Sequence, residues 1–61
     1  MATSPQIRKE IKNTIKSLAK TQGTYSVLYE ACEYNNWEKF EDICDEHDFV
    51  DVVDFIMWLE G

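Results

Sequence analysis

The stretch Trp-Glu-Lys-Phe-Glu-Asp-Ile-Cys-Asp-Glu-His, residues 37–47, decides the fold class. Its apolar residues fall within about 120° of a helical wheel, and its carboxylates fill the opposite side. The apolar set is Trp37, Phe40, Ile43 and Cys44, with His47 at its margin; the acidic set is Glu38, Glu41, Asp42, Asp45 and Glu46. This pattern predicts an amphipathic helix that buries one side against the rest of the chain.

The opening of the chain predicts another helix, with a marked start. Ser4 is a suitable N-cap and Pro5 suits the first helical position. Ile7, Ile11, Ile15 and Leu18 lie within an arc of about 80°, and a separate arc of about 120° is basic. The basic arc consists of Arg8, Lys9, Lys12, Lys16 and Lys20. Gly23 is expected to end this helix in a left-handed conformation.

Two further segments have compositions that suit either a helix or a strand. In residues 24–32, Thr24 is expected to cap a helix that buries Tyr25, Leu28, Tyr29 and Cys32. Asn35 or Asn36 is expected to cap the following helix.

In the last segment, Asp48 and Asp51 resemble a capping box, and the three-residue spacing of Asp48, Asp51 and Asp54 favours a helix. The expected inner side is Phe49, Val52, Val53, Ile56 and Leu59, and the outer side is Asp51, Asp54 and Trp58. We therefore predict one all-α domain over residues 1–61, a compact bundle of three to four short helices.

Charge is unevenly distributed along the 61 residues, whose net charge is −6. Residues 1–22 carry five basic residues against Glu10, a net +4, whereas residues 23–61 carry Lys39 against eleven carboxylates, a net −10. Such a field repels nucleic acid over most of the surface and attracts basic partners.

Enzymatic chemistry and metal binding are poorly supported by the residue types present. His47 has no nucleophile at a recognisable spacing, and two glycines cannot build a phosphate loop. Cys44 and His47 form a single close pair where structural zinc sites use two, and residues 42–54 lack the pattern of a calcium loop. We expect no enzyme, no metal, no cofactor and, because the longest apolar run is Phe55–Leu59, no membrane span. Without a signal peptide, the two cysteines are expected to stay reduced in the cytoplasm.

The acidic residues 38–46 are the most informative functional feature. Five carboxylates on one side give one charge per about 2.4 Å of helix axis, against about 1.7 Å in duplex DNA. Only Lys39 interrupts the run, whereas a face that serves stability alone usually alternates charges of both signs. The alternative interpretation is a solvated face that serves solubility. Tyr34, Val27 and Trp58 are expected to be exposed beside it as interface anchors.

The segment Ala19-Lys20-Thr21-Gln22-Gly23-Thr24-Tyr25, the acidic helix and the ending Phe55-Ile56-Met57-Trp58-Leu59-Glu60-Gly61 together resemble short acidic open reading frames of bacteriophages and prophages. The resemblance carries no activity to any position. It implies a bacterial cytoplasmic setting, in which small acidic phage proteins commonly bind and inhibit a host protein, including defence nucleases and anti-CRISPR targets.

The sequence therefore predicts a protein-binding module that occludes a basic, nucleic-acid-binding surface of a partner protein. The predicted contact residues are Glu38, Glu41, Asp42, Asp45, Glu46, Asp51, Asp54 and Trp58. One alternative is a dimeric nucleic-acid-binding regulator that uses Arg8, Lys9, Lys12, Lys16 and Lys20, which the acidic remainder disfavours. The other is a self-associating structural module, in which the basic helix of one copy lies on the acidic surface of a second copy.

Overall fold

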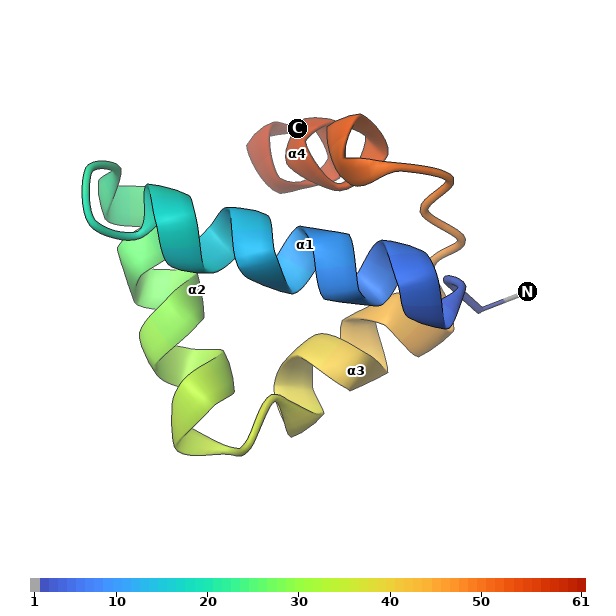
Figure 1. Cartoon of the computed structure of the whole chain (residues 1–61), viewed down its shortest axis with the longest axis horizontal. Coiled ribbons are helices and arrows are strands. Elements are labelled where there is room, and N and C mark those ends of the chain that lie inside the picture. The colour runs from blue at the N-terminus through green and yellow to red at the C-terminus, as the bar shows by residue number, and fades with distance from the viewer. Residues whose placement is uncertain (1) are drawn as a thin grey trace.

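A computed structural model describes residues 2–61, which form four helices and no strand. The helices are α1 (Pro5–Leu18), α2 (Gly23–Tyr34), α3 (Glu38–Glu46) and α4 (Val52–Glu60). Figure 1 shows α1 in the middle of the molecule, with α4 on one side of it and α2 and α3 on the other. The predicted all-α fold is confirmed, and both segments with ambiguous composition are helical.

Helix α1 begins as its sequence predicts, but it ends differently. The Ser4 hydroxyl accepts a hydrogen bond from the Ile7 amide at 3.4 Å, and Pro5 is the first helical residue. The expectation that Gly23 ends this helix is wrong, because the Leu18 carbonyl already accepts the amides of Thr21 and Gln22. Gly23 instead opens α2, where Gln22 is the N-cap and the expected cap Thr24 lies inside the helix.

The corner between α2 and α3 is closed by two consecutive residues in the left-handed region. Asn36 has φ 53° and Trp37 has φ 66°. The Asn36 amide donates to the Glu33 carbonyl and the Trp37 amide to the Cys32 carbonyl. These two bonds are those of a Schellman motif, in which Asn36 takes the position that glycine usually occupies. The prediction that Asn35 or Asn36 caps the next helix is therefore wrong, since Asn36 closes the preceding one.

Helix α4 starts three residues later than the predicted capping box. Asp51 is the N-cap, and its carboxylate accepts the Asp54 amide at 2.9 Å. The Asp54 carboxylate in turn accepts the Val50 amide at 3.0 Å, so Asp54 holds the residue that precedes the cap. Phe49 lies before the helix but is buried.

Aromatic rings from three helices fill the core. Phe40 of α3 and Phe55 of α4 are fully buried, with ring centroids 6.2 Å apart, and Phe49 contacts Phe55 at 5.4 Å. Trp37 lies against Phe40 with centroids 5.8 Å apart. The remaining buried apolar side chains are Ile11, Ile15, Tyr25, Cys32 and Cys44. Aromatic stacking in edge-to-face geometry thus joins the last two helices through the centre of the molecule.

The inner side of α4 differs from the expected one. Val52, Phe55, Ile56 and Leu59 share the inward face at the spacing i, i+3, i+4, i+7. Val53, expected inside, lies on the opposite face and is 59% exposed. Trp58 lies on the exposed side as expected, 39% exposed, with part of its ring against Phe49 and Phe55.

The N-terminal segment is fastened to the end of α3 through Thr3, whose side chain is buried. Its hydroxyl donates to the His47 carbonyl at 2.8 Å and accepts the Phe49 amide at 3.1 Å. Its amide donates to the Cys44 carbonyl at 3.1 Å. Thr3 therefore satisfies main-chain groups on both sides of the point where the chain leaves α3.

Candidate protein-binding surface

Ion pairs with α1 neutralise some carboxylates on the acidic face of α3 and, within residues 2–61, leave the others unpaired. The Arg8 guanidinium contacts Glu41 and also lies 2.7 Å from Asp45, while the Lys12 ammonium lies 3.1 Å from Glu41. The expectation that this face lacks countercharge is therefore wrong for Glu41 and Asp45, because the countercharge comes from a helix more than thirty residues away. These two predicted contact residues are engaged within the chain.

The ion pairs change the protonation of the groups that form them. Partial burial opposes the ionisation of Glu41, but hydrogen bonds from Arg8 and Lys12 outweigh it and lower the pKa of the carboxyl. Hydrogen bonds to Asp45 and Glu41 raise the pKa of Arg8. Arg8 also donates from Nε to the Thr3 carbonyl at 2.7 Å, so this one side chain bonds to Thr3, Glu41 and Asp45.

The other carboxylates of the α3 face remain open. Glu38, Asp42 and Glu46 are exposed, and none forms an ion pair within residues 2–61. They follow one another at four-residue spacing, which puts successive charges about 6 Å apart along the axis. That spacing is wider than the sequence predicts for the full set, and it is also wider than the roughly 3.4 Å between charges along a single strand of DNA.

The predicted contact residues of the last segment have mixed roles. Asp51 and Asp54 are used to cap α4, although their charges remain at its N-terminal end. Trp58 is half covered by Phe49 and His47, whose ring lies 5.0 Å from the indole. The structure thus places Asp51, Asp54 and Trp58 near the start and side of α4, away from the ion pairs of α1.

Sequence reasoning missed an apolar feature beside these carboxylates, which we name the α4 strip: Val50, Val53 and Met57. The three side chains are 68%, 59% and 64% exposed. Val53 and Met57 are four residues apart on α4, and Val50 lies just before the N-cap Asp51. The sequence alone does not show which valine of α4 faces outward, because Val52 and Val53 are equally apolar. Residues 40–61 contain eight carboxylates and no Lys or Arg, so the strip lies in a segment whose only basic residue is His47.

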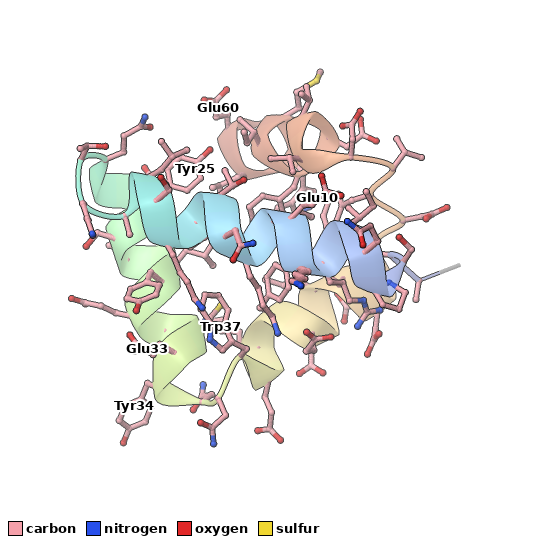
Figure 2. All side chains as sticks on the ribbon, in the orientation of Figure 1. Glu10, Tyr25, Glu33, Tyr34, Trp37 and Glu60 are labelled. Carbon is pink, nitrogen blue, oxygen red and sulfur yellow. The ribbon has the colours of Figure 1, made fainter. Side chains whose placement is uncertain are left out.

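The basic set of α1 is not presented as a unit. Arg8 and Lys12 are paired with α3, and the ammonium groups of Lys12 and Lys16 lie 5.6 and 5.7 Å from the Trp37 ring. Figure 2 shows Trp37 turned inward below α1, whereas Tyr34 projects away from the molecule. A groove of about 600 Å³ beside the start of α1 is lined by Arg8, Lys9, Lys12 and Glu41, so its positive charge is partly neutralised.

Groups capable of covalent or metal chemistry are isolated. Within residues 2–61, no three His, Cys, Asp or Glu side chains are close enough together to hold a metal ion. His47 stacks on Phe49 with centroids 5.5 Å apart, and both cysteines are free and buried. Burial raises the pKa of the Cys32 and Cys44 thiols. In the same part of the chain, every helix is too short or too polar to span a bilayer.

The site is therefore defined by two separate surfaces on either side of the core: the open carboxylates of α3, and the α4 strip with its acidic flanks. Comparisons with protein-family models, with characterised proteins and with solved structures give no match to this chain.

Proposed function

We propose that this protein is an acidic binding module that occupies a basic surface on another protein. The observation that carries the proposal is the absence of Lys and Arg from residues 40–61, which hold three exposed apolar side chains and, besides the paired Glu41 and Asp45, six further carboxylates. Opposite charge speeds the encounter with a basic partner, and apolar contacts slow its dissociation.

The size of an interface brings the α4 strip and its own acidic flanks into one contact. A standard interface covers about 800 Å² on each partner. The accessible surface of this chain is 4176 Å², so such an interface would cover about a fifth of it. A partner that covers Val50, Val53 and Met57 would therefore also contact Asp51 and Asp54 beside them, and a basic surface gains from that contact.

Association between copies of the chain is less favourable than binding to a basic protein. Arg8 and Lys12, which a second copy would need for attraction, are already paired within the chain. Two copies with a net charge of −6 each also repel one another at low salt. The same pairing removes two of the five cations that direct binding of nucleic acid would use.

The test uses two variants that lose the same charge from different places. The first is the triple change Glu38→Gln, Asp42→Asn and Glu46→Gln on the open part of α3. The control is Glu10→Gln, Glu30→Gln and Glu33→Gln, which also changes the net charge from −6 to −3. Glu41 and Asp45 stay unchanged because their loss would weaken the fold.

Proteins captured from a bacterial lysate by the wild-type chain are identified, purified and titrated with each variant. We expect the α3 variant to bind at least about tenfold more weakly than the control, with affinity falling as salt rises. Competition by duplex DNA would identify the occupied surface as one that binds nucleic acid. An equal loss of affinity in both variants would mean that net charge alone drives binding. Unchanged affinity in both would refute the proposal.

A further inference from the structure

The α4 strip lies on and just before a helix whose opposite side is packed into the core. Phe55 and its neighbours on the inward face pack into the core, while Val50, Val53 and Met57 face outward. Val53 and Met57 are four residues apart, about 6 Å along the axis. Figure 1 shows α4 at the edge of the molecule, with α1 along one side of it and no other helix of residues 2–61 on the opposite side. Three large apolar side chains exposed within one eight-residue segment make the strip a candidate contact surface.

The flanks of the strip restrict what can cover it. Asp51 and Asp54 lie at the start of α4 and Glu60 at its end, and no cation lies between Phe40 and Gly61. If two copies paired through this strip about a twofold axis, the acidic flanks of each would face those of the other. Like charges across an interface cost several kcal/mol. The charge pattern therefore selects a different protein, with cations on both sides of an apolar contact.

The backbone of α4 restricts the shape of the partner. Within residues 2–61 there is no strand whose edge could accept an extended peptide, and between its first and last turns the amides and carbonyls of α4 bond within the helix. Recognition must therefore use side chains. Side-chain ridges at helical spacing fit the grooves between side chains of a second helix.

From these observations we infer that the α4 strip docks an amphipathic helix of a partner protein, whose apolar stripe is flanked by Lys or Arg. The apolar stripe covers Val50, Val53 and Met57, and the flanking cations reach Asp51, Asp54 and Glu60. This inference rests on the proposed function, since it names the element of the basic partner that makes the contact.

Three synthetic peptides of fourteen residues separate the features that the inference requires. One is an amphipathic helix of Leu and Lys, the second is a scramble of the same composition, and the third has Glu in place of Lys. Each is titrated into the isotope-labelled wild-type protein while its amide signals are followed by NMR. We expect the amphipathic Leu/Lys peptide to shift the amides of residues 50–60 and to bind at least about tenfold more tightly than the other two.

Two variants locate the contact. Val53→Ser with Met57→Ser should weaken binding of the amphipathic Leu/Lys peptide about tenfold. The control, Val27→Ser with Tyr34→Ser, also removes two exposed side chains. The sequence suggests both as interface anchors, but they lie on α2, outside the α4 strip, so this variant should bind the peptide as the wild type does. If the first variant loses its helical signal, the comparison of the three peptides on the wild-type protein still decides the question.

Each other outcome has a distinct meaning. If the scrambled peptide binds as tightly and shifts the amides of α3, charge alone drives binding, and the inference is overturned while the proposed function stands. Equally tight binding of the Glu peptide would show that charge does not contribute to binding at the strip, which also overturns the inference. If the Leu/Lys peptide does not bind, the inference fails, and the α3 charge variants with the captured partner still test the proposed function separately.

Discussion

Nη2 of Arg8 lies 2.7 Å from Oδ1 of Asp45, so the basic helix and the acidic helix of this chain are joined by direct contact. The pair brings together the two charge blocks that are far apart in the sequence. The charges of Asp45 and Glu41 are thereby partly neutralised within the chain, although the Asp45 side chain stays 60% exposed. The pair also explains why counting charges along the sequence overestimates the number of unpaired charges on both the acidic face and the basic face.

Arg8 should contribute more to stability than any other basic residue of α1. Arg8→Ala removes contacts to Glu41, Asp45 and the Thr3 carbonyl, and we expect it to lower the free energy of unfolding by about 1–2 kcal/mol. Lys9→Ala, at an exposed neighbour with no ion pair in residues 2–61, should change it by less than about 0.5 kcal/mol. Urea unfolding followed by circular dichroism measures both, and equal effects would contradict the role given to Arg8.

Acid should destabilise the protein partly through Glu41. The pKa of this carboxyl is lower in the folded chain than its ordinary value of 4.5, so its stabilising effect is complete above that value. The effect is lost as the pH falls through the lowered pKa. Glu41→Gln should therefore be less stable than the wild type near pH 7, and the difference should shrink toward about pH 3. Urea titrations across this range test the sign, and a difference that does not change with pH would refute it.

Asn36 should be replaceable by glycine with a gain in stability. Its φ of 53° lies in the left-handed region, which glycine adopts without steric cost, so Asn36→Gly should raise the free energy of unfolding by about 0.5 kcal/mol. Asn36→Ala should lower it by about 1 kcal/mol. Asn35→Gly is the control, because Asn35 has φ −99° and should gain nothing. Thermal melting of the three variants would show the order, and a gain at both positions would point to a general effect of glycine.

The hydroxyl of Thr3 should matter more than its methyl group. Thr3→Val keeps the shape but leaves the His47 carbonyl and the Phe49 amide without their partner, which should cost about 1–3 kcal/mol. Thr3→Ser keeps the hydroxyl and should cost less. Hydrogen exchange at the Phe49 amide should accelerate in Thr3→Val, and an unchanged rate would show that this bond does not protect the segment.

Cys32 and Cys44 should react slowly with a thiol reagent in the folded protein. Both are buried and burial raises the pKa of both thiols, so little thiolate is present or accessible at neutral pH. Reaction should become fast in guanidinium chloride, which serves as the control. A metal chelator should leave the melting temperature unchanged. Fast labelling of the folded chain, or a lower melting temperature with the chelator, would contradict this assignment.

Local features that depend on turn chemistry were predicted least well, for identifiable reasons. Asn36 has the chemistry both to cap a following helix and to close a preceding one, and its neighbours do not distinguish the two roles. Gly23 was assigned to a helix end that α1 closes without glycine, through the Leu18 carbonyl. In α4, Val52 and Val53 are chemically equivalent, so the sequence shows that the segment is helical but not which of the two valines faces the core. The position of Phe55 against Phe40 decides which one does.

By itself, the sequence determined the all-helical class, the start of α1 at Ser4 and Pro5, the inward side of α3 and the excess of negative charge. These depend on the period of apolar residues and on composition, which are local properties of the chain. Only the tertiary structure decided that Arg8 and Lys12 neutralise Glu41, that Thr3 fastens the end of α3, and that Val53 and Met57 face outward. Each depends on how helices distant in the sequence cross, and that arrangement is set by packing of the aromatic core rather than by any single segment.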